Sequence, residues 1–212
     1  MQNTTTNFIT LMCHNPEEHK RLLACVDPFM KGVKDDIMGK MTIEAVDELE
    51  YVKLAYNETM RVDTPIATST TSCMNKDVKV NGIDLRAGDA FWVAMNAAHN
   101  DLEQWKQPAL FKPDRFDPTS DWYKRPDGGK RSPFAFSPFL GGVRICLGKT
   151  FAEITLRLTL PLWYHCFEFE LAEPEHMKKR PRPQVGATKS LEVPMRLTTR
   201  NKVAEIPNIK LE

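Results

Sequence analysis

Apolar residues recur at helical spacing in the first part of the chain. Between Asn15 and about Met30 they fall on one side, and Asn15 stands before Pro16 as the N-cap of a helix would. The preceding stretch, NFITLMCH, has the pattern of a helix that is already under way. The same spacing predicts a further helix from near Thr42 to near Val62.

The spacing changes in the stretch DVKVNGIDLRAGDAFWVAM. Apolar and polar residues alternate on both sides of Asn81-Gly82, a pair that favours a two-residue β-hairpin turn. We therefore expect two paired strands around this turn and a third strand from about Ala90 to Met95.

Residues 100–138 are rich in Pro, Asp, Lys and Gly and show little periodicity, which predicts a long irregular connection. The later stretch KTFAEITLRLTLPLWYH is apolar nearly all round, so it predicts a central helix that Pro161 kinks or shortens. Beyond it, CFEFELA and LEVPMRLTTR alternate as strands. These elements predict a mainly α chain with small antiparallel β-sheets, of the α+β class, in which residues 1–212 form a single unit.

The composition is that of a folded, nearly neutral protein. Of the 212 residues 42% are hydrophobic, and 29 Lys and Arg against 28 Asp and Glu give a formal net charge of +1. This balance excludes broad electrostatic attraction to nucleic acid or to an anionic membrane surface. The five cysteines are odd in number and widely spaced, which predicts reduced thiols. No apolar run approaches the roughly 20 residues of a membrane span and no signal peptide is evident, so the chain itself is expected to be soluble and cytoplasmic.

One cysteine stands in an unusual setting, the glycine-rich stretch FLGGVRICLG. In an extended backbone Arg144 and Cys146 project to the same side, so a cation and a thiol face one partner. A predicted helix begins just after the thiol, and its free N–H groups and positive dipole end favour a thiolate. Gly142 and Gly148 permit close approach to a flat body, and Phe139 adds an aromatic surface. These features fit haem, with Cys146 on the iron and Arg144 near a propionate.

Three alternatives to haem ligation exist for this cysteine. A lone cysteine is most often a small buried hydrophobe, but the glycines, arginine and phenylalanine at these spacings argue against that here. A catalytic cysteine nucleophile is a second alternative, and none of the five histidines is marked as its partner. A phosphate-binding loop is a third, but Gly142 and Gly148 are too far apart for its pattern.

The pattern F-x-x-G-x-R-x-C-x-G is filled by Phe139, Gly142, Arg144, Cys146 and Gly148 and is similar to the haem-binding signature of the cytochrome P-450 family. The resemblance implies that these five residues bind haem (iron protoporphyrin IX) and that the Cys146 thiolate is the axial ligand of the iron. It covers essentially all 212 residues, but only the C-terminal half of the family's fold, with the central apolar helix after the cysteine bend.

Two further motifs stand in the family's order. The stretch ETMR, from Glu58 to Arg61, resembles the E-x-x-R helix of the family, and PDRF, with Arg115, resembles its P-x-R-F segment. The resemblance implies that Glu58, Arg61 and Arg115 form a buried network that locks the loop under the haem, a structural role. A solvated surface pair is the alternative for Glu58 and Arg61. For His99, in the stretch after the hairpin, a satisfied structural histidine is favoured over a functional one.

The family's members are longer than this chain. The acid-alcohol pair that delivers protons to bound oxygen is expected at or before Met1, together with a membrane anchor and most of the substrate cavity. Thr71 stands where many members place an arginine for a propionate. Residues 65–72 and the turn 185–189 are expected to contribute to the wall of the substrate cavity.

The resemblance implies a haem-thiolate monooxygenase that inserts one oxygen atom of O2 into a small apolar organic substrate, with electrons from an NADPH-dependent reductase. It implies no nucleic-acid partner and a membrane contact only through the missing N-terminal part. The parent protein is therefore expected at the cytosolic face of the endoplasmic reticulum membrane. Two alternatives stay open: a truncated, non-catalytic haem-binding fragment, and a haem-thiolate enzyme that rearranges peroxides.

Overall fold

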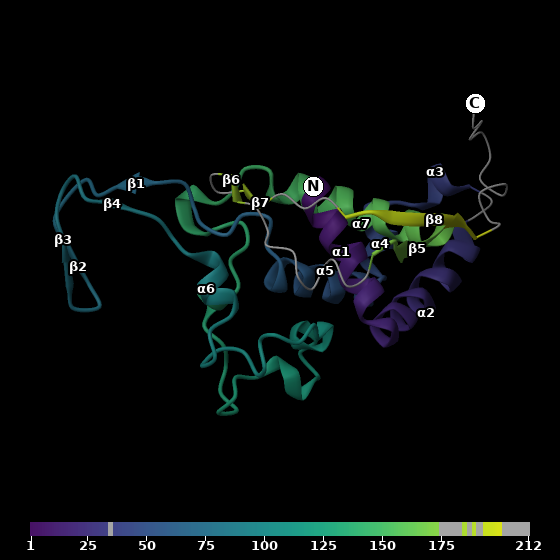
Figure 1. Cartoon of the computed structure of the whole chain (residues 1–212), viewed down its shortest axis with the longest axis horizontal. Helices are drawn as coiled ribbons and strands as arrows, with labels where there is room; N and C mark the ends of the chain where they lie inside the picture. The colour runs from purple at the N-terminus through teal and green to yellow at the C-terminus, as the bar shows by residue number, and fades with distance from the viewer. Residues whose placement is uncertain (34–35, 174–183, 186–187, 190–192, 201–212) are drawn as a thin grey trace.

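The fold is mainly helical, as the sequence predicts. The structure, a computed structural model, describes residues 1–33, 36–173, 184–185, 188–189 and 193–200. Its longer helices are α1 (Gln2–His14), α2 (Pro16–Val33), α5 (Glu50–Val62) and α7 (Lys149–Cys166). These helices gather in one body in Figure 1, while the hairpin region forms an arm that projects away from them.

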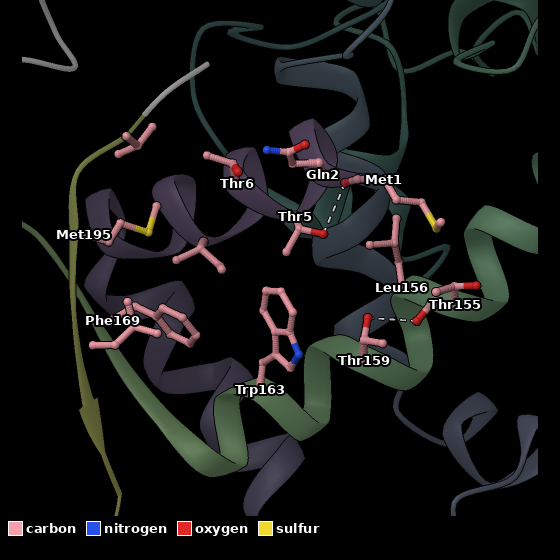
Figure 2. A pocket seen from close by; sticks show the side chains of 13 residues that line it. Met1, Gln2, Thr5, Thr6, Thr155, Leu156, Thr159, Trp163, Phe169 and Met195 are labelled. Carbon is pink, nitrogen blue, oxygen red and sulfur yellow. Dashed lines mark hydrogen bonds between the residues drawn. The ribbon is translucent and has the colours of Figure 1, made fainter. Parts of the chain in front are cut away.

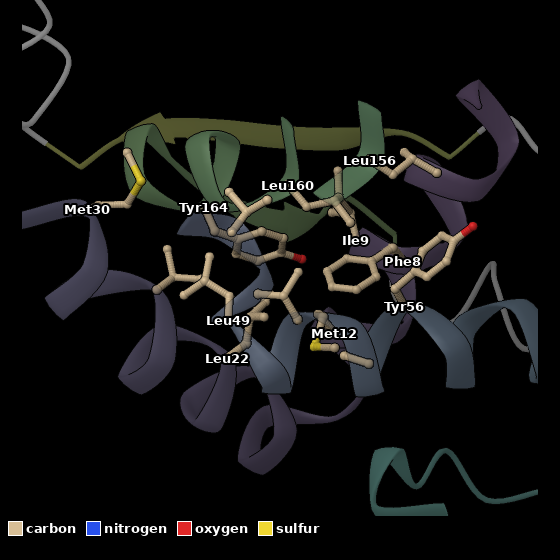
Figure 3. Close-up of a cluster of buried hydrophobic side chains, with 14 of the residues drawn as sticks. Phe8, Ile9, Met12, Leu22, Met30, Leu49, Tyr56, Leu156, Leu160 and Tyr164 are labelled. Atoms are coloured by element: carbon tan, nitrogen blue, oxygen red, sulfur yellow. The ribbon is translucent and has the colours of Figure 1, made fainter. Parts of the chain in front are cut away.

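A hydrophobic core joins the four helices (Figure 3). The ring of Tyr164 on α7 meets the ring of Phe8 on α1 edge to face, with the ring centroids 5.8 Å apart. The fully or almost fully buried side chains around this pair include Met12, Leu22, Tyr56 and Leu160. Because all four helices contribute to one core, α7 is central to the fold, as its apolar sequence predicts.

Pro161 does not shorten α7, so that half of the prediction is wrong. The helix continues past the proline to Cys166. The side chains on either side of it, Leu160 and Tyr164, are each 1% exposed. Their packing offsets the backbone hydrogen bond that a proline removes from a helix.

Asn15 precedes α2 as its N-cap residue, as predicted, because α2 begins at Pro16 and the His19 N–H donates to the Asn15 carbonyl at 2.9 Å, but the Asn15 side chain does not cap that helix. The Asn15 side-chain amide donates to the Leu11 carbonyl at 2.7 Å, so it satisfies the end of α1 instead of capping α2. Asn15 is the one residue between the two helices, and the last carbonyls of α1 compete for its side chain. The first turn of α2 instead carries the acidic residues Glu17 and Glu18, which suit the positive end of a helix dipole.

The helix predicted from Thr42 to Val62 is divided. It consists of α4 (Ile43–Asp47) and α5, and a short α3 (Ile37–Lys40) precedes them. Thr42 caps α4, with its hydroxyl accepting the Ala45 N–H at 3.3 Å. The break occurs at Leu49, whose side chain is 3% exposed, so the chain turns there to bury an apolar residue.

The hairpin at Asn81-Gly82 is confirmed. Strands β2 (Val78–Val80) and β3 (Ile83–Leu85) pair antiparallel, and both turn residues have positive φ, 47° and 84°, as a type I′ turn requires. The expected third strand is only β4 (Ala90–Phe91), and it pairs with β1 (Ser72–Cys73) instead of the hairpin. The strand ends early because the chain enters helix α6 (Met95–His99).

The two predicted strands near the end of the chain are confirmed as one antiparallel pair. Strand β5 (Phe167–Leu171) pairs with β8 (Met195–Thr199), with Phe169 opposite Leu197. Strands β6 (Gln184–Val185) and β7 (Thr188–Lys189) pair antiparallel, and the middle of the predicted turn 185–189 lies outside the described residues. The basic stretch KKRPRPQ lies mostly outside the described residues.

The connection between α6 and the cysteine bend is irregular, as its composition predicts. Its local structure is limited to three short 3₁₀ turns: η1 (Pro113–Phe116), η2 (Asp121–Tyr123) and η3 (Pro133–Ala135). Among the helices in the described part of the chain, none has the length and apolar character needed to cross a membrane.

Candidate functional site

The glycine-rich stretch before α7 folds into a bend that is closed by its own backbone. The Cys146 N–H donates to the Phe139 carbonyl at 2.9 Å, and the Ile145 N–H donates to the Gly142 carbonyl at 3.2 Å. Gly142 has a φ of 64° and Leu140 a φ of 62°, so the chain turns through left-handed conformations there. The bend therefore holds Cys146 by main-chain hydrogen bonds.

The backbone around Arg144 and Cys146 is not extended, so the prediction that an extended strand places both side chains on one side is wrong. Residues Gly142–Arg144 form a 3₁₀ turn, η4, because the positive φ of Gly142 starts a turn where an extended backbone was expected. Both side chains are nevertheless exposed. The Arg144 guanidinium makes no hydrogen bond or ion pair with any described residue.

The thiol stands just ahead of α7. Gly148 is the N-cap residue of this helix. A Cβ atom at this position would lie 3.9 Å from the Cys146 Sγ, so the thiol is close to the start of the helix. The first N–H groups of a helix have no partner within it and carry the positive end of the dipole. The positive end of the α7 dipole therefore lies close to the Cys146 side chain.

Apolar side chains project from the bend into solvent. Val143 and Leu147 are fully exposed, and Phe151 in the first turn of α7 is 65% exposed. Exposed apolar residues gathered in one place mark a surface that binds something. Phe139 differs from them, because it is partly buried and packs against the hydrophobic core.

Glu58, Arg61 and Arg115 lie together in the interior, each with an exposed fraction of 0%. Both oxygens of Glu58 accept from Arg61, whose Nε and Nη2 donate at 2.8 Å. Arg115 Nε donates to Glu58 Oε1 at 3.1 Å. The structure thus places the three in one ion-pair network and not at the surface, the alternative for the i,i+3 pair.

The same guanidiniums bind main-chain carbonyls at the end of α6 and in the irregular connection that follows it. Arg61 donates to the carbonyls of His99 and Pro108, at 2.9 and 2.8 Å. Arg115 donates to the Gln107 carbonyl at 2.8 Å. Burial lowers the pKa of Arg115, the charge of Arg61 lowers it further, and Glu58 opposes both. The network therefore fixes a loop that has little regular structure of its own.

Comparison with known proteins decides the family. A family profile for cytochrome P450 matches residues 1–195. This chain belongs to the cytochrome P450 family. The resemblance drawn from the cysteine bend is thereby confirmed, and so is the α+β class of fold.

Individual cytochromes P450 are similar to this chain at about the same level. Cytochrome P450 18a1 of Drosophila melanogaster is 30% identical over 87% of this chain and 32% of its own length. Mouse cytochrome P450 3A11 is 29% identical over 79% of the chain and 31% of its own length. Mouse thromboxane-A synthase is 32% identical over 81% of the chain and 30% of its own length. The chain spans about a third of the length of these relatives.

His99 of this P450 chain is a structural histidine, as expected. It is fully buried, its Nε2 accepts the Ser137 N–H at 3.1 Å, and its ring lies 5.4 Å from that of Phe136. It joins α6 to the segment that leads into the cysteine bend.

A cluster of charged residues outside the Glu58 network had no signal in the sequence. Glu18 on α2 accepts from the Tyr51 hydroxyl at 2.6 Å and from Lys112 Nζ at 3.0 Å. Arg21 donates to both carboxylate oxygens of Asp114, at 3.1 and 2.7 Å. These residues come from α2, α5 and the PDRF segment, and no local pattern links positions so far apart in the chain.

A cavity of about 750 Å³ lies between α1, α7 and β8 (Figure 2). No residue of the cysteine bend lines it. Thr5 and Thr159 both line it, but their hydroxyls donate within their own helices, to the carbonyls of Met1 and Thr155. This arrangement gives no reason to assign the N-terminal threonines a catalytic role.

Proposed function

We propose that the protein is a haem-thiolate monooxygenase in which Cys146 is the axial ligand of the haem iron. The observation that carries the proposal is the exposed thiol in a hydrogen-bonded bend ahead of α7, with apolar side chains projecting around it. Thiolate ligation of haem by one cysteine needs no second protein ligand on the same side. Within the described residues no group of three His, Cys, Asp or Glu side chains could hold a metal ion.

The residues of the bend fit haem in chemistry. Val143 and Leu147 are fully exposed and would supply apolar surface to a flat apolar ring. The Arg144 guanidinium, which has no partner among the described residues, would pair with a propionate. Gly142, with a φ of 64°, permits the left-handed turn of the bend, Gly148 is the N-cap residue of α7, and Phe139 anchors the bend to the core.

The protein's own residues hold and orient the cofactor. Cys146 would supply the thiolate, which pushes electron density onto a haem iron and favours cleavage of the O–O bond. The Glu58 network would keep the connection beneath the cofactor in place. We further propose a small apolar organic substrate, electrons from an NADPH-dependent reductase, and a location at the cytosolic face of the endoplasmic reticulum membrane.

The carbon monoxide difference spectrum of the reduced protein tests the thiolate assignment. We expect the absorption band of thiolate-ligated haem in the wild type and in Cys73→Ala, and its loss in Cys146→Ala. Cys73 is a suitable control because it is also a free, exposed cysteine. A band typical of histidine-ligated haem in the wild type, or an unchanged band in Cys146→Ala, would contradict the proposal.

A second candidate function keeps the haem-thiolate site but rearranges an organic peroxide without O2. Mouse thromboxane-A synthase, whose name is that of a synthase, is about as similar to this chain as the cytochromes P450 named above, and this favours keeping the candidate. NADPH consumption with an added reductase separates the two functions, since only the monooxygenase requires those electrons. Haem binding without either reaction would indicate a non-catalytic haem-binding chain.

A further inference from the structure

Arg131 lies at the start of the segment that enters the cysteine bend, and its guanidinium sits among aromatic rings. Its Cζ is 4.2 Å from the ring centroid of Trp105, 5.2 Å from that of Tyr123 and 5.8 Å from that of Phe116. Its Nη2 donates to the main-chain carbonyl of Arg115. Among the described residues, no carboxylate lies within ion-pair distance of it.

The electrostatic setting of Arg131 is unfavourable. The pKa of Arg131 is lowered to about 10, mainly by burial and further by the positive charges of Arg115 and Arg61, while Tyr123 and Glu58 oppose the shift. The only carboxylate in the buried network, Glu58, is already bonded to two other guanidiniums. The aromatic rings of Trp105, Tyr123 and Phe116 are therefore the main groups that stabilise the positive charge of Arg131.

The segment after Arg131 is attached to the rest of the molecule at both ends. The Ser132 N–H donates to Gln104 Oε1 at 2.9 Å, and the Ser137 N–H donates to His99 Nε2 at 3.1 Å. Two residues further on, the segment reaches the Phe139 carbonyl that accepts the Cys146 N–H. The Arg131 side chain, bonded to the Arg115 carbonyl, is thus a third attachment of the short segment that leads to the thiol.

We propose that Arg131 is a positioning residue that connects the buried Glu58 network to the segment carrying Cys146 and so keeps the thiolate on the iron. The connection runs from Glu58 through the side chain of Arg115 to its main-chain carbonyl, and from there to Arg131 and the bend. This inference rests on the proposed haem-thiolate function.

The test compares Arg131→Met with Arg125→Met in the haem-loaded protein. Arg125 is a matched control: it lies in the same connection, pairs with the exposed Asp127 at 2.8 Å and donates to the Glu103 carbonyl at 3.3 Å. The quantity measured is a decay rate, the rate at which, in the reduced and carbon monoxide-bound protein, the absorption band of the thiolate-ligated haem is replaced by the band of haem whose thiolate is protonated or displaced. We expect this decay to be about tenfold faster in Arg131→Met and unchanged in Arg125→Met.

A conservative variant separates positioning from folding. Arg131→Lys keeps a cation over Trp105 but loses the planar fork, so its decay rate should lie between those of the wild type and Arg131→Met. Far-ultraviolet circular dichroism of each sample reports the fraction folded. If Arg131→Met does not fold, the comparison of Arg131→Lys with Arg125→Met decides, with about a threefold difference expected.

The outcomes distinguish this inference from the function on which it rests. A wild type without the thiolate band overturns the proposed function and the inference with it. A wild type with the band, but with equal decay rates in the Arg131 and Arg125 variants, overturns the inference alone. Loss of the band strictly in proportion to loss of folded protein would also overturn it.

Discussion

The network around Glu58 and the bend around Cys146 are built in opposite ways. In the network every side chain is fully buried, and carboxylate, guanidiniums and loop carbonyls satisfy one another. In the bend only the main chain is satisfied, and all residues from Gly141 to Gly148 are exposed. The difference separates two tasks: the network supports the loop by itself, and the bend leaves its side chains for a partner.

The largest effect should follow from removing the charge at the centre of the network. Glu58→Gln leaves the guanidiniums of Arg61 and Arg115 buried without a counter-charge, which should lower the free energy of unfolding by about 3–5 kcal/mol. Urea denaturation measures this loss. Glu103→Gln, at an exposed carboxylate in the same connection, should change it by less than about 0.5 kcal/mol. Equal effects of the two changes would show that the network is not a support.

A smaller effect is expected from the charged cluster on the surface side of the network. Asp114→Asn weakens the two hydrogen bonds from Arg21 and should cost about 1–2 kcal/mol. The exposed pair of Lys79 and Asp84 provides the control, because Asp84→Asn should cost well under about 1 kcal/mol. If Asp114→Asn and Asp84→Asn lower the free energy of unfolding equally, the cluster stabilises the protein no more than an ordinary surface ion pair.

The same cluster predicts a pH dependence. Hydrogen bonds from Arg21 hold the pKa of Asp114 below its usual 3.8. Burial raises the pKa of Glu18, but hydrogen bonds from Tyr51 and Lys112 outweigh it and hold the pKa below 4.5. Because the unfolded chain binds more protons in this range, the stabilisation is present above about pH 4.5 and is lost as the pH falls through the lowered values. Asp114→Asn should reduce this acid sensitivity in denaturation measured from pH 6 to about pH 3.

The smallest effect concerns the backbone of the bend. Gly142 has a φ of 64°, so Gly142→Ala should cost about 1 kcal/mol. Gly141 has a φ of −163°, and neither glycine has an atom within 4 Å of an added Cβ, so Gly141→Ala is a control for the conformation alone. Thermal unfolding followed by circular dichroism measures both changes. A loss in Gly141→Ala as large as in Gly142→Ala would argue against the left-handed turn.

Much of the fold could be predicted because local patterns determine it. The Asn81-Gly82 turn and the apolar stripe of α7 depend on neighbouring residues, and both were found from the sequence. The break at Leu49 depends on the burial of its side chain, and the hydrogen bond from the Asn15 side chain to the Leu11 carbonyl depends on competition between two helix ends. The spacing of apolar residues predicts neither. The third strand is shorter than predicted because the chain enters α6 at Met95, and its partner, Ser72–Cys73, lies before the hairpin in the sequence.

The candidate site was predictable to the extent that it is encoded in short motifs. The five positions of the cysteine bend and the Glu58 to Arg61 spacing are visible in the sequence. The turn at Gly142, which replaces the expected extended backbone, is not visible. Nor is the stacking of Arg131 on Trp105, since it joins residues brought together only by the folded connection.

The most direct test of the central claim is X-ray absorption at the iron edge of the haem-loaded protein. The scattering should contain one sulfur atom bonded to iron in the wild type and in Cys73→Ala, and this sulfur should be absent in Cys146→Ala. A first coordination shell made only of nitrogen and oxygen in the wild type, or a sulfur that persists without Cys146, would contradict the assignment of Cys146 as the haem ligand.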